Sequence, residues 1–440
     1  MIVMSYIPVI GLEIHIQLKT LSKMFCASPN NPDEAEPNKN ICEVCTGQPG
    51  SLPVTNAVAV NKAMMVGLAL GCEIPEFSKF DRKNYFYPDL PKGYQISQYD
   101  QPVCGAGTVE LDIPASSDRG EGSKKKKIRI TRAHLEEDAG KLIHKGNSTL
   151  VDLNRAGVPL LEIVTEPDFS SAAEAKKFLQ NLRNIVRYIG VSDADMEKGH
   201  MRCDANVSLR ETGQSGLPDY KIEIKNLNSF KAVESSLNFE IGRQTEERQH
   251  GEKLSHETRG WDETKGVTIL QRTKEAADDY RYFPEPDLPD LHFKRAYVEA
   301  LRRELPELPH EKYHRFIREF GLPPGDVETL INDRALASFF ENVVSELQSW
   351  NEAEKGHAGD TKQLAKTACN RITGDFQALL KKTGVEVKKS KVDAENLAEL
   401  IKLTQSGTLS TTASKKVLEI MFTSGGDPSE IMKDEGLEQV

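Results

Sequence analysis

The chain has 440 residues and a formal net charge of −10, with 57 Lys and Arg against 67 Asp and Glu. This length has room for roughly two to four domains of ordinary size, and the acidic balance excludes a protein that coats nucleic acid through its overall charge, although a local basic patch is compatible with it. The longest apolar run, residues 64–72, falls well short of the roughly 18 residues of a membrane span, and the first residues lack the basic start of a signal peptide. Together with an odd count of seven cysteines, these features predict a cytoplasmic protein that makes no membrane contact.

Strand-like and helix-like segments are unevenly distributed along the chain. Residues 1–293 mix short alternating patterns with a few helices, whereas residues 294–440 show helical patterns almost throughout. Three prolines within residues 283–291 predict a stiff connector between the two parts. The sequence therefore predicts an α+β fold, in which a domain built on an antiparallel β-sheet with flanking helices is followed by an all-helical domain.

Two helices and one loop stand out in the first part. Apolar residues at four-residue spacing after Thr55 predict a helix. Ser171 and Glu174 form a capping-box pattern ahead of an apolar stripe that ends at Gly190, which predicts a second helix. Residues 116–127 are rich in Gly and Ser and end in four consecutive lysines. We interpret them as an exposed hairpin loop, with a specific RNA contact as the alternative.

The strand patterns carry the more informative signal. In residues 10–18, alternation places Glu13 and His15 side by side on the face opposite the apolar one. The same alternation in residues 202–210 and 220–226 presents the polar residues Asp204, Asn206, Ser208, Lys221, Glu223 and Lys225. A solvated sheet face is the ordinary alternative. Short, metal-capable side chains predominate on the first two strands, however, and this favours a functional face there.

Two groups of carboxylates indicate a bound cation. Residues 134–141 contain three consecutive carboxylates beside His134, and such crowding requires a compensating positive charge. Glu162 lies inside the apolar stretch 158–164, where an unpaired carboxylate would be costly. An oxygen-rich ligand set favours Mg²⁺ over Zn²⁺. A structural salt bridge is an equally compatible explanation for Glu162.

Cations and thiols add two further candidate sites. Residues 79–92 combine the cations Arg82, Lys83 and Lys92 with aromatic residues, which suits a nucleotide or an RNA end as well as an ordinary basic loop. The glycine-rich phosphate-binding motif is absent, so an ATP site would have to use side chains of the sheet. The thiols of Cys26, Cys42 and Cys45 are one short of a structural zinc site. Zinc with a different fourth ligand and a site that has been lost are both open interpretations.

Seven long motifs follow one another along the chain: VIGLEIH (9–15), FDRKNYFYPD (80–89), YQISQ (94–98), HLEEDAGK (134–141), VDLNR (151–155), MRCDAN (201–206) and DDYRYFPEPD (278–287). Together they resemble the B subunit of the aspartyl/glutamyl-tRNA amidotransferases. The resemblance covers nearly the whole chain and is strongest over residues 6–290. It implies a cradle-shaped first domain and a heterotrimeric complex with an amidase-type A subunit and a small C subunit.

The resemblance also implies a reaction. In that family, the B subunit uses ATP and Mg²⁺ to phosphorylate the side-chain carboxylate of Glu or Asp misacylated on tRNA(Gln) or tRNA(Asn), and ammonia delivered from the A subunit then displaces the phosphate. The motifs match the family's metal-site positions at His15, Glu137 and Glu162. Catalytic residues are expected beside them at Glu13, Glu136 and Lys83. Binding of ATP or of the tRNA 3′ end is expected at Asn154, Arg155, Asp204, Asn206 and Ser208.

Two features depart from the family pattern. Many members carry a Cys-x-Cys pair where this chain has Cys26 and Ser28, which leaves the zinc site one thiol short. The resemblance also implies a further helical tail domain that contacts tRNA, and we expect this tail domain to be absent from the 440 residues. A non-catalytic tRNA-binding scaffold of the same fold is the rival interpretation. The intact residues of the expected metal site speak against it.

Overall fold

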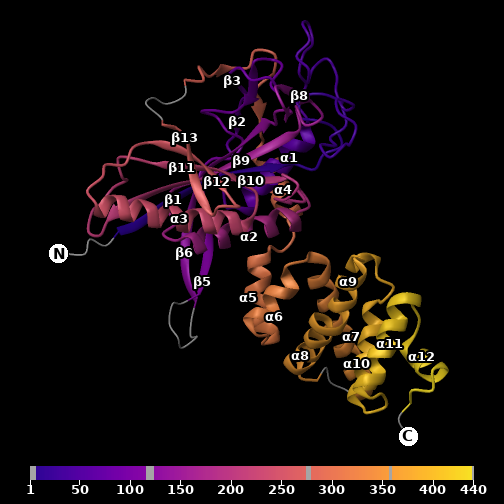
Figure 1. Ribbon diagram of the computed structural model, residues 1–440. Helices are drawn as coiled ribbons and strands as arrows, with labels where there is room; N and C mark the ends of the chain where they lie inside the picture. Colours follow the sequence, from indigo (N-terminus) through magenta and orange to yellow (C-terminus); the bar gives the residue numbers. More distant parts are fainter. Residues whose placement is uncertain (1–5, 115–122, 274–278, 356–358, 439–440) are drawn as a thin grey trace. The chain divides into compact units, whose positions relative to one another are not determined.

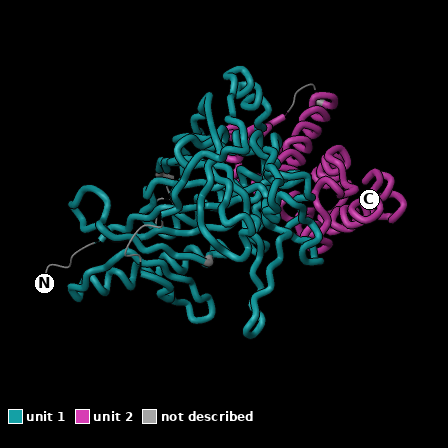
Figure 2. Tube along the Cα trace, turned by 90° about the horizontal axis from the view of Figure 1, so that it is seen from above, with its two compact units in different colours: residues 1–306 teal, residues 307–440 magenta. Residues whose placement is uncertain are grey.

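The computed structural model of the protein describes residues 6–114, 123–273, 279–355 and 359–438. The chain forms two compact units, residues 1–306 and 307–440, which carry different colours in Figure 2. All strands among the described residues lie in unit 1, and the regular elements of unit 2 are helices. This arrangement confirms the predicted α+β fold.

An eight-stranded sheet forms the centre of unit 1 (Figure 1). In spatial order its strands are β13 (Val267–Thr273), β12 (Glu257–Asp262), β11 (Ile222–Leu227), β10 (Met201–Glu211), β1 (Tyr6–Gln17), β9 (Pro159–Thr165), β6 (Ser123–Glu137) and β5 (Gly107–Pro114). Neighbouring strands are antiparallel except β11 and β12, which run parallel. In the central strand β1, the apolar side chains Leu12, Ile14 and Ile16 are no more than 1% exposed. The alternation predicted from the sequence therefore sets one buried apolar face against one polar face.

Three helices pack against this sheet: α1 (Ala57–Ala69), α2 (Ala172–Tyr188) and α3 (Phe230–Gln249). Helices α2 and α3 contact each other, α3 contacts β10 and β11, and α1 contacts β6. Helix α2 begins as predicted, because the Ser171 hydroxyl accepts a hydrogen bond from the backbone N–H of Glu174 at 3.2 Å. Helix α1 begins after Asn56, whose side chain accepts from the backbone N–H groups of Val58 and Ala59.

Small sheets connect distant parts of unit 1. Strand β3 (Asp81–Asn84) lies between β14 (Phe283–Pro284) and β4 (Tyr94–Ser97). Strand β2 (Phe77–Ser78) pairs with β15 (Leu291–His292), and β7 (Lys141–Lys145) forms a hairpin with β8 (Ser148–Asp152). Strand β14 comes after the eight-stranded sheet in the chain and pairs with β3. This pairing brings the motif around residue 280 next to the motif around residue 83.

The lysine run at 124–127 does not belong to a loop, and that part of the expectation is wrong. Strand β6 already begins at Ser123, and its residues pair with β5. Acidic residues of β5 lie opposite the lysines, with Glu110 across from Lys127 and Asp112 across from Lys125. This cross-strand charge pairing favours extension of the hairpin. The remainder of the expected loop, residues 115–122, lies outside the described residues.

Helix α4 (Arg295–Glu304) follows the predicted boundary at 293 and contacts α1 within unit 1. Unit 2 contains α5 (Pro309–Phe320), α6 (Pro324–Ile331), α7 (Arg334–Lys355), α8 (Thr361–Arg371), a π-helical turn (Ile372–Phe376), α9 (Gln377–Thr383), a 3-10 turn (Val387–Lys389), α10 (Ala394–Gln405), α11 (Thr411–Ser424) and α12 (Pro428–Asp434). A core that includes Phe316, Phe340 and Phe376, all fully buried, holds these helices together. Among the described helices of both units, none has the length and apolar character needed to cross a membrane.

Candidate active site

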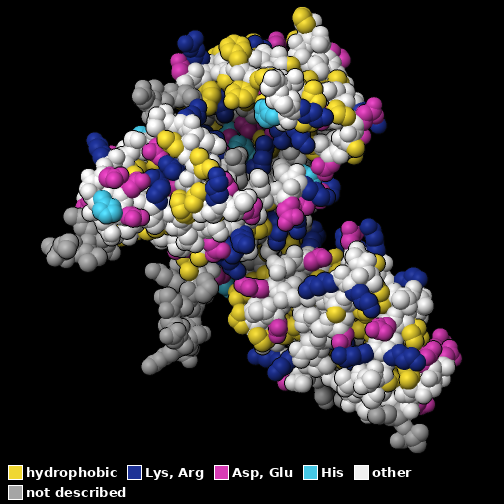
Figure 3. Space-filling view, in the orientation of Figure 1, with side chains coloured by type: hydrophobic (Ala, Val, Ile, Leu, Met, Phe, Trp, Pro, Cys, Tyr) yellow, Lys and Arg dark blue, Asp and Glu magenta, His cyan; other side chains and the backbone are white. Residues whose placement is uncertain are grey.

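The polar face of the eight-stranded sheet gathers side chains from four adjacent strands. Strand pairing sets His15 of β1 opposite Glu162 of β9, and Glu162 opposite His134 of β6. On the other side of β1, Glu13 lies opposite Asp204 of β10. In the space-filling view, acidic, basic and histidine side chains gather in a recess of unit 1 (Figure 3). The sheet therefore brings together residues that are far apart in the sequence.

A histidine and two carboxylates converge at the centre of this face. Nδ1 of His15 lies 3.2 Å from Oε1 of Glu136 and 4.0 Å from Oε2 of Glu162. The three side chains offer ligand atoms that all lie within 4.8 Å of one another. His134 borders the group, with its Nε2 3.5 Å from Oε2 of Glu162. We call His15, Glu136 and Glu162 the acidic cluster.

Charges within the acidic cluster stabilise one another against burial. Burial alone would lower the pKa of His15, but the carboxylates of Glu136 and Glu162 outweigh it and raise this pKa to about 9. Burial alone would raise the pKa of Glu136, but His15 and Lys83 lower it to about 2. Among the described residues, Nδ1 of His15 and Oε2 of Glu136 still have no hydrogen-bond partner. A divalent cation that replaced the proton of His15 would satisfy both atoms, and a ligand set of carboxylates with one imidazole fits such an ion.

Lys83 of β3 supplies a positive charge to the acidic cluster. Burial alone would lower the pKa of its ammonium group, but Glu136 and Glu162 raise this pKa above its ordinary range. The ammonium nitrogen lies 4.8 Å from the ring centre of Tyr280. The structure thus brings together four of the predicted site residues, Lys83 and the acidic cluster.

Glu137, which the motifs suggested as a metal ligand, has different partners. Its Oε1 lies 2.6 Å from Nζ of Lys92 and accepts a hydrogen bond from the backbone N–H of Ile96 at 3.0 Å. Consecutive residues of a strand point to opposite faces of the sheet. Glu136 therefore takes the place beside His15 that the motifs suggested for Glu137.

A second polar group lies next to the acidic cluster on β1 and β10. Oε1 of Glu13 accepts a hydrogen bond from Nδ2 of Asn206 at 2.9 Å, and Oδ2 of Asp204 accepts one from Nζ of Lys225 at 3.0 Å. Oδ1 of Asn206 is buried without a hydrogen-bond partner among the described residues. Ser208 lies two residues further along β10 and is 6% exposed. The predicted residues Glu13, Asp204, Asn206 and Ser208 thus line one strand pair.

The remaining predicted residues, Asn154 and Arg155, bind the backbone of nearby loops. Oδ1 of Asn154 accepts hydrogen bonds from the N–H groups of Lys39 and Asn40, both at 2.9 Å. Arg155 donates to the carbonyl oxygens of Ala139 and Gly140, at 2.9 and 2.6 Å. Arg155 also pairs with Oδ2 of Asp138 at 3.7 Å, and none of these partners of Asn154 and Arg155 belongs to the acidic cluster.

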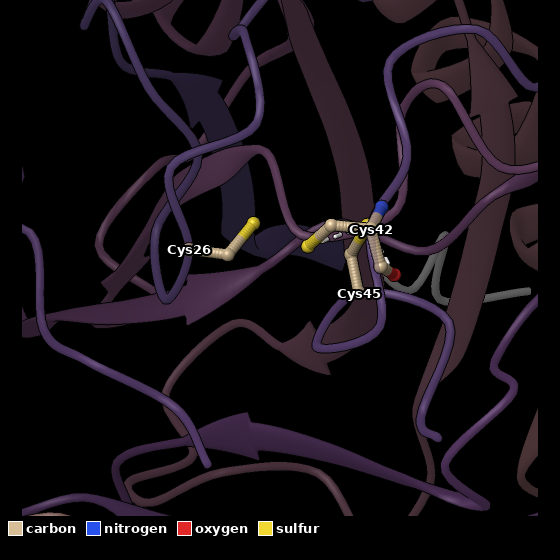
Figure 4. Close-up of side chains that lie close together, drawn as sticks. All are labelled: Cys26, Cys42 and Cys45. Carbon is tan, nitrogen blue, oxygen red and sulfur yellow. Dashed lines mark hydrogen bonds between the residues drawn. The ribbon is translucent and has the colours of Figure 1, made fainter. Parts of the chain in front are cut away.

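Three thiols approach one another in the loop region that follows β1. The Sγ atoms of Cys26, Cys42 and Cys45 lie within 4.8 Å of one another and point toward a common centre (Figure 4). Hydrogen bonding with Cys45 and burial raise the pKa of the Cys26 thiol, and hydrogen bonding with Ser28 acts in the opposite direction. A hydrogen bond from Cys26 lowers the pKa of Cys45 to about 5, with the nearby Lys23 ammonium acting in the same direction. We call these three residues the thiol cluster; its donor set fits a thiophilic ion such as Zn²⁺.

Comparisons with known proteins identify the family. Residues 8–299 match the model of the GatB/GatE catalytic domain, and residues 355–440 match that of the GatB domain. The B subunit of the aspartyl/glutamyl-tRNA(Asn/Gln) amidotransferase of Thermotoga maritima is 46% identical to the chain, over 99% of this chain and 87% of its own length. The corresponding protein of Thermomicrobium roseum is 48% identical, over 99% and 86%. The chain belongs to the amidotransferase B-subunit family.

Membership of the amidotransferase B-subunit family confirms the resemblance drawn from the seven motifs, and with it the assignment to a carbon–nitrogen ligase of translation.

Two residues of the site were not among those predicted. His134 shares the face of Glu136 because the two are two residues apart on β6. Arg202, opposite His15 on β10, binds Asp138 with both contacts at 2.9 Å. The spacing of His134 could have indicated it, whereas Arg202 could be found only from the strand register.

Proposed function

We propose that this chain activates the side-chain carboxylate of a Glu or Asp residue misacylated on tRNA by transferring phosphate from ATP. The proposal is supported by one observation above all: His15, Glu136 and Glu162 converge beside the ammonium group of Lys83. Carboxylates crowded next to a cation suit phosphoryl transfer, in which charge on the transferring group must be offset.

The reaction balances as two displacements. A carboxylate oxygen of the aminoacyl group attacks the γ-phosphorus of ATP, the bond from that phosphorus to the β,γ-bridging oxygen breaks, and ADP leaves. The resulting acyl phosphate has a good leaving group where the carboxylate had none. Ammonia then attacks the carbonyl carbon, phosphate departs, a proton is released, and the amide of Gln-tRNA(Gln) or Asn-tRNA(Asn) remains.

The residues of the acidic cluster hold and orient the groups of this reaction. When bound by His15, Glu136 and Glu162, Mg²⁺ would supply positive charge to phosphate oxygens. Lys83 keeps its proton in this setting and offsets negative charge on the carboxylate or phosphoryl oxygens. The neighbouring group around Glu13, Asp204 and Asn206 is available for the polar atoms of the nucleotide or of the ribose at the tRNA end.

The acyl phosphate requires partners and protection from water. Hydrolysis would destroy the intermediate, so ammonia must arrive through a closed path. We propose that it comes from an amidase-type A subunit in a complex that also contains a C subunit. The relatives carry the name of one component of such an enzyme. A protein that amidates aminoacyl-tRNA acts where translation occurs, which places this one in the cytoplasm.

The thiol cluster is proposed as a structural zinc site with a weak fourth ligand. When bound, zinc would take its three sulfur ligands from Cys26, Cys42 and Cys45, and we propose the hydroxyl of Ser28, two residues after Cys26, as the fourth ligand. Thiolates bind Zn²⁺ more strongly than a hydroxyl does. A zinc ion at this site would take no part in phosphoryl transfer. We assign the site a role in stabilising the loops that contain the thiol cluster.

Turnover of ATP distinguishes the proposed activation of the carboxylate from the function of a non-catalytic tRNA-binding scaffold. The experiment is ATP hydrolysis by the chain assembled with its A and C subunits, measured with and without misacylated tRNA. We expect hydrolysis that depends on the misacylated tRNA, together with formation of the amide when glutamine is supplied. A complex that binds the tRNA but hydrolyses no ATP would establish the scaffold instead.

A further inference from the structure

Five tyrosines form a continuous row beside Lys83. Successive ring centres, in the order Tyr87, Tyr85, Tyr280, Tyr282 and Tyr99, are separated by 6.5, 6.0, 6.1 and 4.5 Å. The first three contacts are edge-to-face, and the last is a parallel stack with an interplanar angle of 14°. These distances are those of favourable aromatic pairs. We call these five residues the tyrosine row.

Two segments that are far apart in the chain build the tyrosine row. The backbone N–H of Asn84 donates to the carbonyl oxygen of Tyr280 at 3.0 Å, and its side chain donates to that of Arg281 at 2.8 Å. Arg281 has a φ of 46°, in the left-handed region that residues other than glycine rarely adopt. This strained residue separates Tyr280 from Tyr282, whose rings contact each other. Strain of this kind is retained where a particular arrangement is needed.

The inner part of the tyrosine row adjoins the acidic cluster. The Lys83 ammonium lies 4.8 Å from the ring centre of Tyr280 and 5.9 Å from that of Tyr85. Burial raises the pKa of Tyr282 to about 12, and the negative charges of Glu136 and Glu162 act in the same direction. The inner rings of the row therefore lie next to the residues to which we assign phosphoryl transfer.

The ends of the tyrosine row are open to solvent. Tyr87 and Tyr99 are 61% and 55% exposed. A cluster that served only as a small core would bury its rings, whereas these two present large apolar surfaces to water. Side chains of the hydrophobic class, which includes tyrosine, border the recess of unit 1 in Figure 3. The exposed ends call for a ligand with flat, apolar faces.

We propose that the tyrosine row is the stacking surface for the unpaired 3′ end of the aminoacyl-tRNA, with bases resting on Tyr99 and Tyr87. This inference rests on the proposed function and assigns the substrate-holding residues of the same site. Unpaired bases stack on aromatic side chains whatever their sequence. Lys83 lies against the ring of Tyr280, and Arg281, which pairs with Asp279 at 3.3 Å, separates Tyr280 from Tyr282 in the chain; both cations would be available to the phosphates of a stacked strand.

The length of the row favours an RNA end over the adenine of ATP. A single base needs one ring or a pair of rings, whereas five contiguous rings match several consecutive nucleotides. The position of the row is also appropriate, because the aminoacyl group is attached to the terminal nucleotide. Lys83 lies against Tyr280 and Tyr85 in the middle part of the row, so a strand held by the row would keep that group close to the acidic cluster.

A double-mutant cycle on tRNA binding tests this proposal without requiring turnover. Dissociation constants are measured for the assembled complex with intact tRNA and with the same tRNA trimmed of its unpaired 3′ nucleotides. We expect Tyr99→Ala to weaken binding of intact tRNA by about 5- to 150-fold, the range for loss of one base–aromatic stack, and to leave binding of trimmed tRNA unchanged. Tyr99→Phe keeps the ring and should bind both as the wild type does. Tyr297→Ala removes another exposed ring, 43% exposed and outside the row, and should change neither constant.

Other outcomes overturn the proposal. Equal weakening of intact and trimmed tRNA by Tyr99→Ala would mean that the ring supports the fold rather than the 3′ end. A raised KM for ATP with unchanged tRNA affinity would assign the row to adenine. No effect on either ligand would leave it without a binding role. Glu136→Gln should bind intact tRNA normally while losing turnover, so a failure of the proposed reaction is distinguishable from a failure of the tyrosine row.

Discussion

Glu136 and Glu137 are neighbours in the chain, but their side chains lie on opposite faces of strand β6. Oε1 of Glu136 lies 3.2 Å from Nδ1 of His15, whereas Oε1 of Glu137 lies 2.6 Å from Nζ of Lys92. Both carboxylates are almost completely buried, at 2% exposure. Two side chains that a motif cannot distinguish thus have different electrostatic partners, and their substitution should have different consequences.

Replacing Glu136 with Gln should lower tRNA-dependent ATP hydrolysis by about 100-fold or more, because it removes a charged member of the acidic cluster. Replacing Glu137 with Gln should leave this rate within a few-fold of the wild type. It should instead lower the free energy of unfolding by about 3 kcal/mol, since the partly buried Lys92 ammonium loses its charged partner. Steady-state rates and denaturant unfolding of both variants provide the measurements. The reverse pattern would assign the metal site to Glu137.

Lys83 should be required for chemistry rather than for folding. Its ammonium group stays protonated because Glu136 and Glu162 raise its pKa against the effect of burial. Lys83→Met removes this charge, and we expect kcat for amide formation to fall by about 100-fold or more. Lys83→Arg keeps the charge in a different geometry and should recover part of the rate. A Lys83→Met enzyme with wild-type kcat would exclude Lys83 from the reaction.

Substitution of Asn154 should mainly affect stability and substitution of Asn206 should mainly affect kinetics, although the motifs suggested that both residues bind the substrate. Asn154 is 1% exposed and donates to the Glu36 carbonyl at 2.8 Å, besides accepting two backbone hydrogen bonds. Asn154→Ala should therefore cost about 2–4 kcal/mol of unfolding free energy, with KM for ATP and tRNA unchanged. Asn206→Ala should mainly change kinetics, since its partner is Glu13. Thermal unfolding and kinetic assays of both variants provide the measurements. A raised KM in the Asn154 variant would show that Asn154 binds the substrate after all.

The sequence predicted which strands carry polar faces but not how their side chains meet. Alternation alone placed Glu13 beside His15, and these residues do share one face of β1. The sequence could not show which of the consecutive carboxylates at 136–138 lies on the polar face of the sheet. Each of them fits either face until the pairing of β6 with β9 is known. For the lysines at 124–127, composition suggested a loop, yet acidic residues on β5 favour a strand. Such cross-strand pairing between separate segments is invisible to local patterns.

The thiol cluster provides a prediction at Ser28, the position where the sequence pattern led us to expect a further cysteine. Ser28 follows Cys26 by two residues, and we propose that a thiol at position 28 would complete a four-sulfur site with the three cysteines. Ser28→Cys should therefore raise zinc affinity by at least about 100-fold, because a thiolate replaces a weak oxygen ligand. Competition with a chromophoric chelator measures this affinity in the full-length protein. Ser349→Cys adds a thiol on helix α7 of the other unit and should leave the affinity at the wild-type value. If Ser28→Cys and wild type bind zinc equally, the three thiols do not form the site, and their proximity reflects packing of the loops alone.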